Sequence, residues 1–215
     1  MTKKTILSLV VILVCGMAFF APMAQAELIT INITATVNYL EDFGNYLEGK
    51  IHVGDTITGS YTYESTTPDT NPFDDPTVGD YWHYAQPAGI SLTVGGFDFK
   101  TDPTNVNFLA SIGNNHSGRD VYLMRSYNNL SLSNGTGVDY ISWQLDDHTQ
   151  TAFSSDVLPA TAPILSQWQF NNLRIDRVGD YLIDAQVTNA IVIPEPTTLL
   201  LLLLGAVAIK NVKHF

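Results

Sequence analysis

Oxygen-bearing side chains gather in one proline-rich stretch, residues 68–80. Three prolines restrict its backbone, and the candidate ligands are Asp69, Asn71, Asp74, Asp75 and Asp80. Calcium takes roughly six to eight hard oxygen ligands, and a stiff loop lowers the entropy cost of bringing carboxylates together. The stretch is therefore a candidate calcium site, although its spacing does not match an EF-hand loop. The simpler interpretation is a solvated acidic loop in a protein without cofactors, and the sequence leaves both open.

Two aromatic residues directly after this loop form a second candidate site. Trp82 and Tyr84 alternate in the run 81–84, so an extended strand places them on one face. An exposed aromatic face can stack on the apolar face of a sugar ring, while Asp and Asn side chains bind hydroxyl groups. A place in the core is the competing interpretation, because most large aromatic side chains of alternating strands point inward.

No pattern in the sequence singles out a catalytic centre. There is no G-x-S-x-G nucleophile elbow, and the five histidines lack the spacing of a zinc site. Carboxylate pairs abound among 21 acidic residues, so none stands out as a glycosidase pair. We therefore predict no catalytic residues and no enzymatic activity, with a secreted hydrolase as the least favoured alternative.

The charge balance limits the partners of the chain. Residues 27–193 hold six basic and 20 acidic side chains, and they contain no cysteine. A strongly acidic surface repels phosphate groups, so nucleic acid and anionic lipid are poor partners. Without cysteine this region has no disulfide, and its stability depends on burial and backbone hydrogen bonds.

Alternating apolar and polar residues predict strands through most of the chain. In Leu28–Leu40 the apolar face consists of Ile29, Ile31, Ile33, Ala35, Val37 and Tyr39. The other predicted strands are Thr56–Glu64, Tyr81–Ala85, Ile90–Val94, Val106–Ile112, Asp120–Tyr127, Val138–Leu145, Gln167–Ile175 and Tyr181–Val192. Asn134-Gly135 also predicts a tight hairpin between Asn129–Ser133 and Val138–Leu145. We expect an all-β domain over residues 27–190, an antiparallel two-sheet β-sandwich that is jelly-roll-like.

The N-terminal residues have the composition of a secretory signal peptide. Lys3 and Lys4 precede an apolar run from Ile6 to Ala21, and Ala24-Gln25-Ala26 forms an A-x-A cleavage site. We expect residues 1–26 to form a signal helix that signal peptidase removes. The protein is then exported, and Glu27 becomes the first mature residue.

The C-terminal residues 191–215 combine three parts in a fixed order. Pro194-Glu195-Pro196 is followed by an apolar run and then by Lys210 and Lys213, and the leucines of the run are Leu199, Leu200, Leu201, Leu202, Leu203 and Leu204. A helix over 197–209 is about 20 Å long, which is short against about 30 Å of hydrocarbon. Leucines on every face followed by lysines nevertheless favour a membrane anchor over a buried core helix.

This order of parts resembles the PEP-CTERM sorting segment of exported proteins in Gram-negative bacteria. The resemblance implies that Pro194, Glu195 and Pro196 are recognised by exosortase, a membrane-embedded protease-like enzyme. It also implies a precursor held transiently in the inner membrane. The family usually ends in a denser basic cluster than these two lysines. The segments Val53–Tyr63 and Thr151–Pro159 resemble stretches of uncharacterised PEP-CTERM proteins, which implies a shared secreted β module.

These observations together predict a non-enzymatic structural or adhesive protein of the cell surface or the extracellular matrix, such as that of a biofilm. The alternative is a module that binds extracellular polysaccharide (exopolysaccharide) through Trp82 and Tyr84, with or without calcium. The predicted partners are signal peptidase, exosortase and such a polysaccharide.

Overall fold

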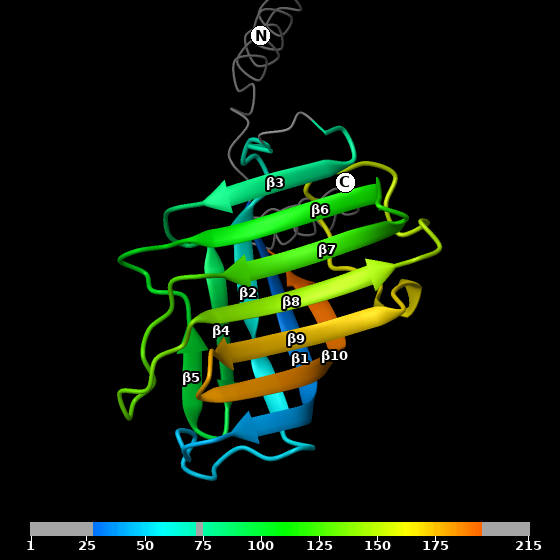
Figure 1. Cartoon of the computed structure of the whole chain (residues 1–215). Helices are drawn as coiled ribbons and strands as arrows, with labels where there is room; N and C mark the ends of the chain where they lie inside the picture. The colour runs from blue at the N-terminus through cyan, green and yellow to red at the C-terminus, as the bar shows by residue number, and fades with distance from the viewer. Residues whose placement is uncertain (1–27, 72–74, 195–215) are drawn as a thin grey trace, which may run out of the picture.

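The structure is a computed structural model and describes residues 28–71 and 75–194 (Figure 1). These residues form ten strands and one 3-10 helix: β1 (Leu28–Asp42), β2 (Thr56–Glu64), β3 (Val78–His83), β4 (Gly89–Val94), β5 (Phe97–Lys100), β6 (Phe108–His116), β7 (Arg119–Ser126), β8 (Tyr140–Asp147), η1 (Leu165–Gln167), β9 (Phe170–Arg177) and β10 (Tyr181–Ile193). Within those two ranges there is no α-helix, and so none that could cross a membrane. The predicted signal helix and the helix over 197–209 lie outside the described residues.

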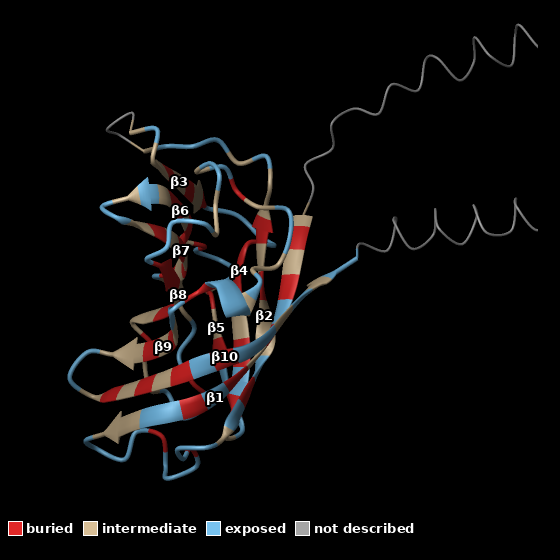
Figure 2. Ribbon diagram, turned by 90° about the vertical axis from the view of Figure 1, so that its right-hand side faces the viewer, coloured by how far each residue is buried: buried red, intermediate tan, exposed pale blue. Residues whose placement is uncertain are grey.

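All ten strands belong to one antiparallel sheet. Its order is β3-β6-β7-β8-β9-β10-β1-β2-β4-β5. The sheet curls so that the half containing β3 and β6–β9 faces the half containing β2, β4 and β5 (Figures 1 and 2). The prediction of an all-β antiparallel domain is confirmed, but the two layers are joined in one continuous sheet instead of two separate ones.

β1 and β10 form a long two-stranded ribbon at the place where the sheet curls from one half into the other. β10 pairs with β1 along its whole length, but with β9 only through Tyr181–Ala185. The β1–β10 register shifts twice, between Thr34 and Ala35 and between Val37 and Tyr39. Such bulges bend a strand and increase its twist, which lets one ribbon pass from one layer to the other.

Because of the second bulge, one residue that was predicted to lie in the core lies outside it. Tyr39 was expected on the apolar face of β1, but it is 44% exposed. The extra residue in the bulge reverses the alternation, so Leu40 packs against the core in its place. The five earlier apolar residues of this strand, from Ile29 to Val37, are buried as predicted.

The core between the two halves is rich in aromatic side chains. Trp143 and Trp168 are buried, and the hydroxyl groups of Tyr61 and Tyr122 lie 2.6 Å apart in a hydrogen bond. Burial raises the pKa of both tyrosines well above its usual value, so both stay protonated. Tyr63 donates from its hydroxyl to the carbonyl oxygen of Pro159 at 2.5 Å, which ties the β8–β9 connection to β2.

Several local predictions differ from the structure. The strand predicted for Gln167–Ile175 begins only at Phe170, because Gln167 lies in η1. β5 was not predicted, although Gly95 and Gly96 provide the positive φ angles of a two-residue hairpin between β4 and β5. Asn134-Gly135 does form a tight turn, with the Gly135 N–H donating to the Leu132 carbonyl. No strand precedes that turn, because Leu130 and Asn129 bond to the end of β5 instead of to β8.

Candidate functional site

An aromatic surface lies on the outer face of the half-sheet that contains β3. In β3 the side chains of Tyr81 and His83 are buried, while that of Trp82 points outward. Tyr84 follows on the same outward side and is 70% exposed. Trp82 and Tyr84 therefore lie on the same face, as the alternation predicts, and this face is the outer one.

Trp82 is the centre of a stacked group of three rings. Its ring lies 6.2 Å from that of Tyr84, and the two planes differ by only 5°. The ring of Tyr127 also stacks on it, with its centre 5.5 Å away and its plane at 28°. We call Trp82, Tyr84 and Tyr127 the aromatic strip. Because Tyr84 and Tyr127 remain exposed, the strip offers amphipathic aromatic surface to a ligand.

The strand register brings Arg125 beside this strip. Trp82 pairs with Leu109 of β6, and Leu109 pairs with Arg125 of β7, so Trp82 and Arg125 lie two strands apart on the same face. The guanidinium group of Arg125 lies over two rings, 5.8 Å from the centre of Tyr127 and 5.5 Å from that of Tyr140. The Tyr140 hydroxyl in turn donates to Asp176 at 2.6 Å.

His83 fixes the strand on the buried side of the strip. Its Nδ1 lies 3.1 Å from the carbonyl oxygen of Tyr81, and its Nε2 accepts from the backbone N–H of Glu64 at 3.2 Å. This pattern requires the proton on Nδ1. Burial lowers the pKa of His83, so the ring is neutral at neutral pH. We assign it a positioning role, since it joins β3 to the end of β2.

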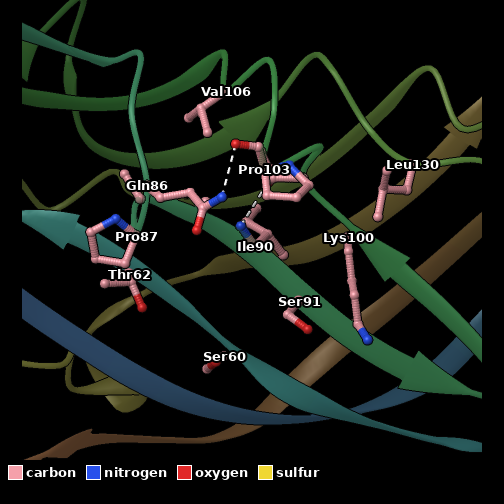
Figure 3. Close-up of a pocket in the computed structure, with 13 residues that line it drawn as sticks. Ser60, Thr62, Gln86, Pro87, Ile90, Ser91, Lys100, Pro103, Val106 and Leu130 are labelled. Carbon is pink, nitrogen blue, oxygen red and sulfur yellow. Dashed lines mark hydrogen bonds between the residues drawn. The ribbon is translucent and has the colours of Figure 1, made fainter.

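A groove of about 290 Å³ lies on the far side of the Gln86–Pro87 turn (Figure 3). Its polar side chains are Ser60, Thr62, Gln86, Ser91 and Lys100, and its apolar ones include Pro87, Ile90, Val106 and Leu130. Gln86 donates to the Pro103 carbonyl at 2.9 Å, which holds the turn against the β5–β6 connection. A smaller pocket of about 160 Å³ lies on the other side of the same turn, next to Trp82 and Tyr84.

Two of the predicted calcium ligands, Asp69 and Asp75, accept hydrogen bonds within the acidic loop. One carboxylate oxygen of Asp69 accepts from the N–H groups of Asn71 at 2.9 Å and Asp80 at 2.8 Å. Asp75 accepts from the N–H and hydroxyl groups of Thr77, and these bonds lower the pKa of Asp75. Asp74 lies outside the described residues. Among the residues described, no three carboxylate or imidazole groups converge as a metal site.

Only the first residue of the predicted sorting segment is described. Pro194 is exposed and directly follows the last strand residue, Ile193. Glu195, Pro196 and the predicted anchor residues, Leu199–Leu204 with Lys210 and Lys213, lie outside the described residues. A scan against protein-family models, a search of curated proteins and a search of solved structures each returned no match to this chain.

Proposed function

We propose that this chain is an exported, non-enzymatic adhesive protein whose β domain binds polysaccharide at the cell surface or in the extracellular matrix. The observation that supports this best is the aromatic strip. Large aromatic side chains are usually buried, so three stacked rings on an outer sheet face are an uncommon feature. A sugar ring that stacks against them would cover this aromatic surface.

The surroundings of the strip favour binding over catalysis. His83 is buried and held by backbone groups, and Asp176 is occupied by the Tyr140 hydroxyl. The groove beyond the Gln86–Pro87 turn adds hydroxyl, amide and ammonium groups that suit the hydroxyls of a saccharide chain. We further propose that the curled sheet is a jelly-roll-like two-layer sandwich, and the facing halves of the sheet support this.

Trp82→Ala is the variant that tests polysaccharide binding. The full-length chain is run in native gels that contain dextran, polygalacturonate or dextran sulfate, and its retardation gives the affinity. We expect the variant to lose about tenfold or more in affinity for the polymer that retards the wild type, because a stacked aromatic contact contributes on the order of 1.4 kcal/mol or more. Repeating the gels with a calcium chelator tests the calcium-dependent alternative.

Phe43→Ala serves as the matched control. Phe43 is 73% exposed in the β1–β2 connection, away from the strip, so its removal should leave the retardation unchanged. Equal retardation of the wild type and Trp82→Ala, or no retardation by any of the three polymers, would show that the strip is not a polysaccharide site.

We also propose that exosortase processes the C-terminal segment after export. Two features of the fold support this. β1 and β10 are neighbouring strands, with Thr30 paired to Ile193, so the chain enters and leaves the domain at the same end (Figure 2). Ile191 and Ile193 are 57% and 41% exposed, and Pro194 has no backbone N–H to extend the strand. The Pro-Glu-Pro motif therefore begins outside the packed domain, where a membrane enzyme could reach it.

Replacing Leu201 and Leu203 together with Asp should abolish retention of the precursor in the membrane fraction. Each charge costs on the order of 3 kcal/mol at the centre of a membrane helix. Cell fractionation followed by intact-mass measurement checks this, and Val157→Asp on the domain surface is the control. We expect the wild-type surface form to start at Glu27 and to end near Pro196. Unchanged fractionation of the double variant would contradict the anchor.

A further inference from the structure

We infer that the aromatic strip is built for a saccharide that carries a negative charge, a carboxylate or a sulfate group, and that Arg125 binds this group. The inference rests on the proposed function and names the class of polysaccharide. Its basis is the environment of Arg125, which differs from that of every other basic side chain in the described part of the chain.

Arg125 has no acidic partner within the described ranges. The other five basic side chains there all form ion pairs: Lys50 with Glu48, Lys100 with Asp98, Arg119 with Asp146, Arg174 with Asp184, and Arg177 with Asp139 and Asp180. This domain has far more carboxylates than basic groups, so pairing is the expected state for a basic side chain. An unpaired guanidinium group in such a domain indicates a partner from outside.

The Nε atom of Arg125 is also buried without a hydrogen-bond partner among the described residues. A buried donor that makes no hydrogen bond lowers stability, because its contact with water is lost and not replaced. The two rings that flank the guanidinium group, Tyr127 and Tyr140, restrict its orientation. The group is therefore held in place before any ligand binds, which lowers the entropy cost of binding.

The carboxylates close to Arg125 along the sheet are already engaged. Asp176 accepts from the Tyr140 hydroxyl, and Asp184 binds Arg174 through two hydrogen bonds of 2.7 and 2.8 Å. Arg125 thus provides an unneutralised positive charge directly beside the aromatic strip. A sugar ring stacked on Trp82 or Tyr127 would bring an acidic substituent within reach of this guanidinium group, for which a carboxylate or sulfate is a well-matched acceptor.

The negative net charge of the chain limits recognition of an anionic ligand to short-range contacts. A formal net charge of −11 repels a polyanion at long range. At about 0.15 M salt this repulsion is screened beyond about 8 Å, whereas a direct hydrogen-bonded contact is affected much less. Recognition of the anionic group is therefore local and depends on one arginine.

Arg125→Gln tests the inference in the same native gels, with the full-length chain. We expect polygalacturonate or dextran sulfate to retard the wild type more strongly than neutral dextran, and the stronger of the two identifies the anionic group. The variant should lose about tenfold in affinity for that charged polymer, since a charge-assisted hydrogen bond is removed. Its weaker affinity for dextran should not change, because the three rings of the strip remain. Arg125→Lys, which keeps the charge without the planar fork, should fall between the two.

Lys50→Gln is the matched control, because it removes one positive charge from the β1–β2 connection, where Lys50 is already paired with Glu48. Thermal unfolding confirms that each variant is folded. If Arg125→Gln binds the charged polymer as well as the wild type does, or if dextran is preferred to both charged polymers, the inference is overturned. In either case the effect of Trp82→Ala still decides the proposed function. If no polymer retards the chain, both are overturned.

Discussion

Replacing Asp147 with Asn should lower the free energy of unfolding at pH 7 by about 3 kcal/mol. The Asp147 side chain is fully buried at the end of β8. It accepts hydrogen bonds from the N–H groups of Thr149 at 2.7 Å, Thr151 at 2.8 Å and Ala152 at 3.0 Å, and from both threonine hydroxyls. Asparagine has the same shape, but its amino group is a donor and would face donors.

These bonds fasten the beginning of the long β8–β9 connection. The N–H of the next residue, Phe153, is bound by the equally buried Asp120 at 2.9 Å. Beyond it, Leu158 is buried and Phe153 packs against the core beside Trp168. Loss of the Asp147 contacts would loosen a segment that covers core side chains, so the cost extends past the hydrogen bonds themselves.

The effect of Asp147→Asn should depend on pH. Burial alone would raise the pKa of Asp147, but the hydrogen bonds from Thr149 and Thr151 outweigh it and hold the pKa well below its usual value of 3.8. A carboxyl group with a lowered pKa stabilises the fold fully above its pKa in the unfolded chain, and this contribution is lost as pH falls toward the folded value. The difference between wild type and variant should therefore be largest above about pH 5 and shrink steadily below about pH 4.

Urea unfolding followed by tryptophan fluorescence at pH 7, 4 and 3 measures this difference. Asp102→Asn is the control, because Asp102 makes the same turn with the N–H and hydroxyl groups of Thr104, but at the protein surface. Its effect should be much smaller. Equal losses in the two variants, or a loss in Asp147→Asn that does not vary with pH, would contradict the role assigned to Asp147.

The sequence predicts most strands because their alternation is local. The bounds of β2, Thr56–Glu64, agree with the prediction, since an alternating run lies directly after the Gly54 turn. The single curled sheet could not be predicted in this way. It depends on pairing between β1 and β10, which come from opposite ends of the domain sequence, and on one bulge in each of these two strands. The apolar pattern continues unbroken to Tyr39, so it gives no sign of the second bulge.

The sequence predicts the candidate site only where its residues are close together in the chain. Alternation alone places Trp82 and Tyr84 on one face, and this is what the structure shows. Tyr127 and Arg125 come from β7 and reach the same surface through the intervening β6. The groove combines residues from β2, β4, β5 and three connections. Such sites depend on sheet order, which a single sequence does not contain.

Gly59→Ala should lower the free energy of unfolding by about 3 kcal/mol or more, although it adds a single methyl group. Gly59 lies in the middle of β2, between Ile33 of β1 and Leu92 of β4. A Cβ atom here would overlap the carbonyl oxygen of Ser91 and would lie 2.8 Å from the Cα atom of Leu92. Both are backbone atoms, so no change of rotamer relieves the contact, and β4 must move away from β2.

The position of Gly59 in the sheet order makes such a movement costly. In the described sheet, β4 and β5 follow β2 at the end of the strand order, so separating β2 from β4 weakens the whole edge of that half. Thermal unfolding measures the loss, with Ser60→Ala, whose side chain points outward beside it, as a nearly neutral control. A melting temperature of Gly59→Ala close to that of the wild type would show that the sheet can widen here.

Because Ser60 and Ser91 both line the groove, a folded Gly59→Ala protein also reports whether the groove contributes to polysaccharide binding. Unchanged gel retardation would then assign binding to the aromatic strip alone.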